Sequence, residues 1–312
     1  MISYVEKKEN KMAVNSILRA DAEALIEPQI AKQIIEGVAT TSAAMKLFTR
    51  LPNMTSDKTK LRVLDQLPLA YWVDGDAGMK QTTKQAWDKK FINACEMATI
   101  IPIPEAVLED ADYDIWAIVK PRAIEALARL FDDATFTGTG KPTGFRDGLL
   151  QSIPTGAQIT QSGTLYVAIS DAMKAVEESG FVPNGVVGGP SLKSKFRMML
   201  DTSGQPIKGT EIDSIQREYI VNGSWKDSVA QMIVGDMKQA VYAIRQDVTV
   251  KLLTEAVIQD PSDGEIIYNL AQQDMVALRL VMRLGWEIPN PINILQPNKA
   301  VRFPFAMIKP KA

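Results

Sequence analysis

The feature that most constrains the fold is a run of strict alternation near the C-terminal end. Apolar side chains occupy every second position of this run: Val276, Leu278, Leu280, Met282, Leu284, Trp286 and Ile288. The intervening positions are more polar and include Arg279, Arg283 and Glu287. Side chains alternate between the two faces of a strand, whereas a helical pattern repeats every 3.6 residues. The run therefore predicts one long strand with a single face in the core.

Two helical patterns lie upstream of this strand. Ile124, Leu127, Ala128 and Phe131 have the spacing of one buried helix face and predict a long helix over residues 114–134, in which Pro121 indicates a kink or a late start. A second helix over residues 165–176 is followed by Gly180 as a C-cap candidate. A shorter helix should follow Pro190. With strand candidates at 186–187, 219–221, 232–234 and 241–244, residues 150–244 read as a compact α/β unit.

A long hairpin is predicted over residues 60–103. The outgoing strand carries Leu61 and Val63, the turn-rich segment 74–78 reverses the chain, and the return runs through Trp87 and Phe91. A two-stranded ribbon alone is marginally stable in water, so one this long needs a partner surface. The alternative is an ordinary hairpin packed on its own domain. Residues up to about 50 are helix-prone but only weakly amphipathic, which suggests an arm lying on another surface.

The amino-acid composition excludes several classes of function. The 312 residues include 35 Lys and Arg and 37 Asp and Glu, giving a net charge of -2, which argues against tight, salt-sensitive nucleic-acid binding as the main activity. The chain has no histidine, and Cys95 is its single cysteine. The commonest general base, an internal disulfide and a Cys-rich zinc site are all excluded. The longest uncharged run, residues 148–170, is too polar to span a membrane.

Short motifs that suggest chemistry each lack a required part. Gly138-Thr139-Gly140-Lys141 continues with Pro142 and follows a helix, unlike a phosphate-binding loop. The segment 110–114 imitates a calcium loop but lacks its later glycine and glutamate, and helix capping explains it better. Cys95 reads as a small buried hydrophobe, and the Asp132-Asp133 pair reads as solvated carboxylates rather than an acid/base dyad. We therefore assign no catalytic, cofactor-binding or metal-binding residue.

The order of the pieces resembles the Hong Kong 97-type major capsid protein of tailed bacteriophages. Four segments, between them spanning much of residues 60–300, carry the resemblance: Ala70-Tyr71-Trp72-Val73-Asp74-Gly75, residues 101–110 before the long helix, Val234-Gly235-Asp236-Met237 with the residues up to Tyr242, and residues 269–279 opening the last strand. Each is loose alone, but their order and spacing are specific.

The resemblance implies an α+β fold with a spine helix, long strands, an α/β axial domain, an extended E-loop hairpin and an N-terminal arm. Its divisions are 1–55 for the arm, 56–96 for the E-loop, 97–150 and 245–312 for the peripheral domain, and 151–244 for the axial domain. The function implied is a structural one, self-assembly into pentamers and hexamers of an icosahedral head enclosing DNA. The alternatives are an encapsulin-type nanocompartment shell and, more remotely, a cytosolic nucleotide-binding enzyme using residues 138–141.

Partners and contact residues follow from the same resemblance. The chain should bind itself, a separate scaffolding protein, a portal and double-stranded DNA without sequence preference, with a decoration protein as an optional partner and no membrane. It should reside in the virion after assembly in the host cytoplasm. No cofactor is implied. The E-loop residues expected to contact neighbouring subunits are Tyr71, Trp72, Asp74, Asp76, Lys80 and Trp87.

Some members of this group join an E-loop lysine to an asparagine of a neighbouring subunit, assisted by a buried glutamate. Lys80 falls about where that lysine would lie, but the alignment places Asp274 at the asparagine position and Val281 at the glutamate position. A shift by one residue would bring Gln273 to the acceptor position without supplying the base. An ionised carboxylate is a poor electrophile toward an amine, and valine cannot accept a proton. The sequence predicts a shell without this cross-link.

Overall fold

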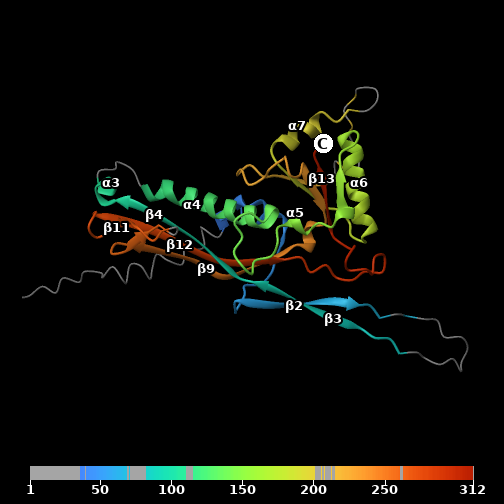
Figure 1. Ribbon diagram of the computed structural model, residues 1–312, viewed down its shortest axis with the longest axis horizontal. Coiled ribbons are helices and arrows are strands. Elements are labelled where there is room, and N and C mark those ends of the chain that lie inside the picture. Colours follow the sequence, from blue (N-terminus) through green and yellow to red (C-terminus); the bar gives the residue numbers. More distant parts are fainter. Residues whose placement is uncertain are drawn as a thin grey trace, which may run out of the picture.

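The computed structural model describes residues 36–38, 40–68, 70, 82–109, 115–200, 205, 207, 212, 215–260 and 263–311. Two sheets organise these residues, and a hairpin projects from the body (Figure 1). The helices are α2 (Ala43–Leu47), α3 (Glu105–Glu109), α4 (Ile115–Asp132), α5 (Leu149–Ser152), α6 (Leu165–Glu178) and α7 (Ser191–Arg197). Three short turns of other helix types are η1 (Asp133–Thr137), η2 (Thr155–Ala157) and η3 (Met237–Gln239).

The peripheral sheet has four strands in the order β1-β9-β12-β4: β1 (Thr49–Arg50), β9 (Val241–Leu253), β12 (Met275–Glu287) and β4 (Cys95–Pro104). β12 is the strand that the alternation predicts. All the apolar positions predicted for its core face, from Val276 to Ile288, are buried. β12 pairs antiparallel with both neighbours along almost its whole length, which makes it the central strand of the sheet.

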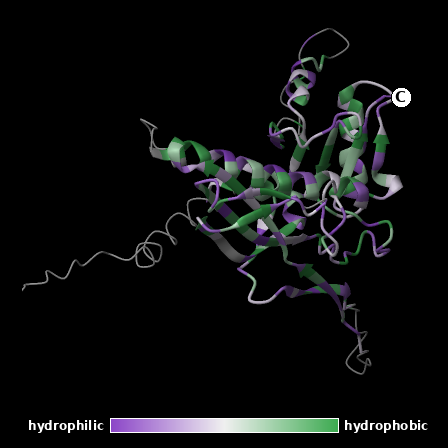
Figure 2. Cartoon of the chain, turned by 60° about the vertical axis from the view of Figure 1, so that its left-hand side comes forward, coloured by the Kyte–Doolittle hydropathy of each residue, from purple (hydrophilic) through white to green (hydrophobic). Residues whose placement is uncertain are grey.

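The spine helix α4 lies along this sheet, and bands of hydrophobic and hydrophilic residues alternate along it (Figure 2). Of the four residues predicted for its buried face, Leu127, Ala128 and Phe131 are buried and Ile124 is partly buried against the same core. Pro121 lies inside the helix, so a start at the proline is wrong. After Asp132 the helix widens into the π-helical turn η1, which ends at Gly138 with a left-handed φ of 74°. The Gly138 amide closes this turn by donating to the carbonyl of Asp133 at 3.0 Å.

The axial sheet has five strands in the order β5-β13-β8-β6-β7: β5 (Gln158–Thr160), β13 (Phe305–Lys309), β8 (Met232–Gly235), β6 (Gly185–Gly188) and β7 (Gln216–Tyr219). Helix α6 packs against β13, β8 and β5. Gly180 follows its C-cap with a φ of 80°, as expected of a helix-ending glycine. The strand predicted at residues 219–221 corresponds to β7, which runs from Gln216 to Tyr219.

The sheets divide the chain differently from the expected domain limits at two places. Residues 241–244 open the 13-residue strand β9 of the peripheral sheet, although the expected axial domain included them. β13 lies in the axial sheet, although residues 245–312 were expected to return to the peripheral domain. Local patterns cannot reveal either crossover, because strand partners are chosen by contacts far apart in the sequence.

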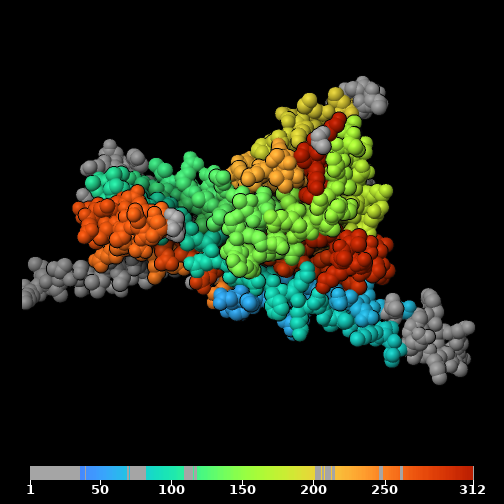
Figure 3. Space-filling view, viewed as in Figure 1, coloured from blue at the N-terminus to red at the C-terminus, as the bar shows by residue number. Residues whose placement is uncertain are grey.

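Two smaller ribbons extend the molecule. β2 (Lys58–Gln66) pairs with β3 (Ala86–Asn93), which confirms the predicted hairpin arms, and β10 (Val257–Gln259) pairs with β11 (Ile266–Asn269). Only Ala94 separates β3 from β4, so the hairpin continues the edge strand of the peripheral sheet. The hairpin and the β10–β11 ribbon lie at opposite ends of the body in the space-filling view (Figure 3).

A close backbone contact fixes the base of the hairpin. A β-carbon added at Gly285 of β12 would overlap the carbonyl oxygen of Asn93 and approach a methyl group of Ile92. We expect Gly285→Ala to lower the free energy of unfolding by about 1–3 kcal/mol, because the backbone of residues 92–94 must shift. Urea denaturation measures this change. The control is Gly163→Ala, where no atom lies within 4 Å of the added carbon. Equal midpoints for the two variants would contradict the prediction.

Candidate assembly surfaces

The arm helix α2, the spine helix α4 and the axial domain meet at one buried carboxylate. Asp132, at the end of α4, accepts four hydrogen bonds: from the Ser42 hydroxyl (2.6 Å), from the amides of Ala43 and Ala44 (3.1 Å each) and from the Asn222 side chain (2.7 Å). The first three donors belong to the N-terminus of α2. Burial raises the pKa of Asp132, and these hydrogen bonds oppose that rise.

This observation corrects the interpretation of the Asp132-Asp133 pair as solvated carboxylates. Asp132 is fully buried, whereas Asp133 remains partly accessible and lies 3.7 Å from Arg129. The two neighbours therefore have different environments. Nothing in the local sequence reveals the capping role of Asp132, since its donors are about 90 residues away on both sides.

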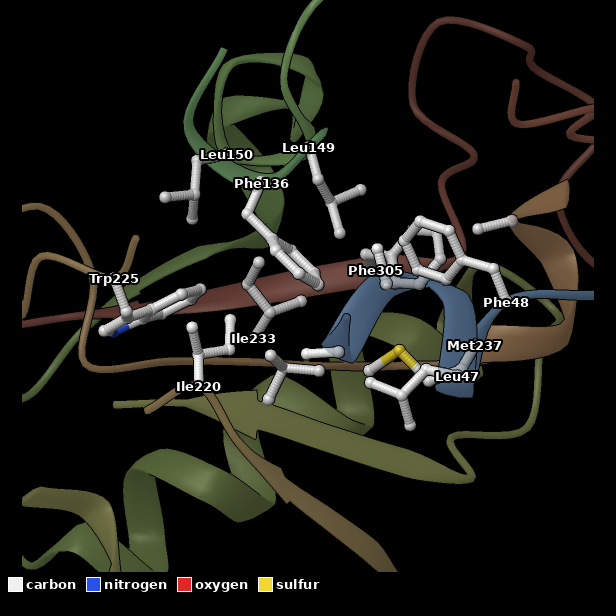
Figure 4. Close-up of a cluster of buried hydrophobic side chains, with 14 of the residues drawn as sticks. Leu47, Phe48, Phe136, Leu149, Leu150, Ile220, Trp225, Ile233, Met237 and Phe305 are labelled. Carbon is white, nitrogen blue, oxygen red and sulfur yellow. The ribbon is translucent and has the colours of Figure 1, made fainter. Parts of the chain in front are cut away.

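A chain of aromatic rings crosses the same junction. Phe48 stacks on Trp286 of β12 at 5.8 Å between ring centroids and meets Phe136 of η1 at 6.0 Å. Phe136 in turn contacts Trp225 of the axial domain at 6.1 Å. The close-up of this core shows Phe136 pointing into the cluster between Leu149 and Trp225 (Figure 4). These rings are buried. Phe48, which directly follows α2, thus links Trp286 of the peripheral sheet to the axial domain.

The E-loop stem, defined as β2 and β3, has two unlike faces. Val63 and Ile92 are buried against the body. On the opposite face, Trp87 is 59% exposed and Phe91 is 49% exposed. Trp87 was predicted to contact neighbouring subunits; Tyr71, Trp72, Asp74, Asp76 and Lys80 lie outside the described residues. Aromatic side chains of this size left in water are typical of interaction surfaces.

Polar contacts tie the inner face of the E-loop stem to the segment after β12. Lys90 donates to the carbonyl of Ile288 at 2.6 Å and lies 3.9 Å from a carboxylate oxygen of Glu287, which also pairs with Arg146. Asp88 pairs with Lys299, and the Ile292 amide donates to the carbonyl of Leu64 at 3.0 Å. Burial lowers the pKa of Lys90 to about 8, with the neighbouring charge of Arg146 acting in the same direction. The stem is therefore held at a fixed angle to the body.

The candidate chemical groups have structural partners. Lys141 forms an ion pair with Asp147 at 2.6 Å, and Gly138 and Gly140 have the left-handed φ values of turns. Cys95, predicted to be a small buried hydrophobe, is half-buried and packs against the core, and burial raises the pKa of its thiol. Among the described residues, no cluster of three or more Cys, Asp or Glu side chains is placed to hold a metal ion. Within the same residues, no helix is both long and apolar enough to cross a membrane.

Comparison with known proteins agrees with this architecture. Residues 22–296 match the phage capsid family. The chain belongs to the phage capsid family. It is 26% identical over 261 residues to the major capsid protein of Staphylococcus phage 80alpha, covering 82% of this chain and 79% of that protein. Its role is thus that of a structural capsid protein.

Solved structures of phage proteins share the fold of this capsid protein. A Microbacterium phage Oxtober96 structure aligns with a TM-score of 0.76 and 31% identity, over 95% of this chain and 100% of the other. A Mycobacterium phage Adephagia structure aligns with the same TM-score and 26% identity, over 87% and 90% of the two chains. These matches confirm the Hong Kong 97-type α+β fold expected from the sequence.

The buried carboxylate gives a test of the junction. Replacing Asp132 by Asn leaves one acceptor oxygen and turns an amide toward backbone and side-chain donors. We expect this change to lower the free energy of unfolding of the unassembled subunit by about 1–3 kcal/mol. Asp133→Asn is the matched control and should cost less than about 1 kcal/mol, because its ion pair is partly exposed. Denaturant titrations of both variants measure the difference, and similar losses would contradict the assigned role.

The lowered pKa of Lys90 in the E-loop stem predicts how the stability of the subunit changes with pH. Folded Lys90 releases its proton near pH 8, whereas the unfolded lysine holds its proton to about 10.5. Between these values the unfolded chain binds more protons, so raising the pH favours the folded state. The stability of the wild type relative to Lys90→Met should therefore rise across this window. Urea titrations of both proteins at several pH values measure it. A difference that stays constant with pH would show that the lysine is not desolvated.

Proposed function

We propose that this chain forms the shell of a phage head, in which pentamers and hexamers enclose double-stranded DNA within the virion. The observation that carries the proposal is the two-faced E-loop stem. Its inner face is fastened to the body through Lys90 and Asp88, while Trp87 and Phe91 on the outer face remain in water. A rigid projection with exposed aromatic anchors supports contact with another subunit. Heterologous contacts of this kind close into rings.

The same proposal assigns the chain a structural rather than an enzymatic role. The groups that might carry chemistry are engaged in the fold: Lys141 with Asp147, and Asp132 with the arm helix. We further propose a separate scaffolding protein, a portal and sequence-independent contact with DNA as partners, with a decoration protein as an optional addition, and assembly in the host cytoplasm.

Electron microscopy of the chain expressed alone tests this proposal. We expect rings, tubes or polyhedral shells of irregular size, since the scaffolding protein that would set the size is missing. A protein that stays monomeric at all concentrations would contradict the shell function. Uniform shells of a single size from the chain alone would instead contradict the need for a separate scaffolding protein.

The E-loop should drive assembly while contributing little to folding. We expect replacement of residues 74–84 by a short Gly-Ser turn to leave a soluble, cooperatively unfolding subunit that forms no shells. Trp87→Ala is a milder variant: its free energy of unfolding should change by less than about 0.5 kcal/mol, because the ring is exposed. Assembly should weaken, since truncated aromatic anchors commonly cost more than about 2 kcal/mol. Circular dichroism and light scattering separate the two effects. Unfolding of the shortened protein would place the hairpin in the core.

The mature shell should lack covalent bonds between subunits, because the aligned positions hold Asp274 and Val281 rather than an amide and a carboxylate. Boiled, reduced particles run on a denaturing gel should give a band near the subunit mass of 34.4 kDa. A ladder of multimers that survives this treatment would contradict the prediction.

A further inference from the structure

Two asparagine–glycine pairs occur in this chain, Asn184-Gly185 and Asn222-Gly223. Glycine has no β-carbon, so its backbone approaches other groups more closely than that of any other residue. In such a pair the glycine nitrogen is therefore well placed to attack the side-chain amide of the preceding asparagine. The two pairs share this local chemistry, and only the fold distinguishes them.

The side chain of Asn222 is held in one orientation at the junction with the spine helix. Its Nδ2 donates to the carboxylate of Asp132 at 2.7 Å, and its Oδ1 accepts from the amide (3.2 Å) and the hydroxyl (2.7 Å) of Ser224. A carboxylate accepts and a backbone amide donates, which excludes the flipped side chain. Ser224 is buried, so both of its donors are shielded from water. Two such donors stabilise the negative charge that develops on a carbonyl oxygen when its carbon is attacked.

The amide nitrogen of Gly223 is free to make this attack. Within the described part of the chain it donates to no acceptor, and the residue is exposed. Its φ of 81° is left-handed, and a β-carbon added there would meet no atom beyond its chain neighbours nearer than the Cζ of Arg129, at 4.0 Å. Ile220 and Trp225, on either side of this turn, are both buried in the core shown in Figure 4. The turn is therefore anchored at both ends while the glycine nitrogen remains open to solvent.

Asn184 has similar side-chain partners but a different glycine. Its Nδ2 donates to Asp236, and its Oδ1 accepts from the amide of Met237 at 2.9 Å. Gly185, however, is buried in β6, where it pairs with β7 on one side and β8 on the other. The backbone of a residue in the middle of a sheet cannot turn toward a neighbouring side chain without breaking the ladder. Asn184 therefore serves as an internal control.

We propose that Asn222 is a site of self-modification, at which the amide nitrogen of Gly223 displaces ammonia from the asparagine side chain. Hydroxide removes the proton from this nitrogen, a bond forms to Cγ of Asn222, and the Cγ–Nδ2 bond breaks. The departing nitrogen takes a proton from water, so ammonia leaves, hydroxide is regenerated and a cyclic imide remains. Water then opens the imide to aspartate, or to isoaspartate when it attacks the other carbonyl. The change needs no enzyme and does not depend on the shell function.

The product alters the junction at the end of the spine helix. Asp132 loses the donor at 2.7 Å and gains a carboxylate in its place, so two like charges face each other in a buried site. We expect Asn222→Asp to lower the urea midpoint of unfolding. The loss should be smaller when Asp132→Asn is also present, because the like charge is then absent. The axial domain of an aged subunit is thus held less firmly to α4 than that of a new one.

Mass spectrometry of the folded subunit, incubated at mildly alkaline pH, measures the conversion of amide to acid at both sites. Asn222 should be converted about tenfold faster than Asn184, because only its neighbouring glycine nitrogen is free to attack. In urea the two sites should react at similar rates, since the local chemistry is the same. Labelling by an isoaspartate-specific methyltransferase identifies the rearranged product, which direct hydrolysis of the amide cannot give.

Ser224→Ala tests whether the fold activates the asparagine. Removal of the hydroxyl donor should slow the conversion of Asn222 in the folded protein by about tenfold and leave its rate in urea unchanged. Ser228→Ala, at an exposed serine shortly after the turn, is the matched control and should react like the wild type. Circular dichroism confirms that both variants are folded.

Four outcomes would overturn the inference. Equal rates at Asn222 and Asn184 in the folded subunit would show that the fold does not select the site. Conversion of Asn222 that is slower in the folded subunit than in urea would show that the junction protects it. A Ser224→Ala variant that reacts like the wild type would mean that the local sequence alone sets the rate. An acid product without isoaspartate would exclude attack by the glycine nitrogen.

Discussion

The described fold depends on the buried junction at the end of the spine helix. An ionised carboxylate in the protein interior is costly unless donors surround it, and Asp132 meets this condition only when the arm helix and the axial loop are both in place. The aromatic rings from Phe48 to Trp225 close around the same point. The arm helix α2 is therefore an integral part of the fold. Buried side chains of α2 and of both sheets belong to one continuous hydrophobic core.

A π-helical turn directly follows Asp132 at this junction. Asp132 precedes this turn and Phe136 lies within it, and both side chains are buried. Turns of this kind are rare and occur frequently at functional positions. Here the turn lies where the long peripheral element gives way to the axial domain.

The composition conceals how charge is distributed. A net charge of -2 suggests a surface without large charged patches, and the sequence contains no continuous run of basic residues. In the fold, alternation along β2 brings Lys58, Lys60 and Arg62 onto one face and adds Lys89 from β3. The acidic residues between 252 and 278 gather at the other end of the molecule. The total charge near zero therefore conceals regions of opposite sign on one subunit.

The sequence by itself determined the elements whose patterns are local. The alternation at 276–288 specified β12 and its buried face, the spacing of Leu127, Ala128 and Phe131 specified the spine helix, and the order of motifs specified the family. The tertiary structure alone decided which strands pair, so that β9 runs far into the peripheral sheet and β13 returns to the axial one. It also decided that Asp132 is buried while Asp133 is not, and that Lys90 is partly desolvated. The physical reason is that burial and hydrogen bonding depend on partners distant in sequence, whereas periodicity depends only on neighbours along the chain.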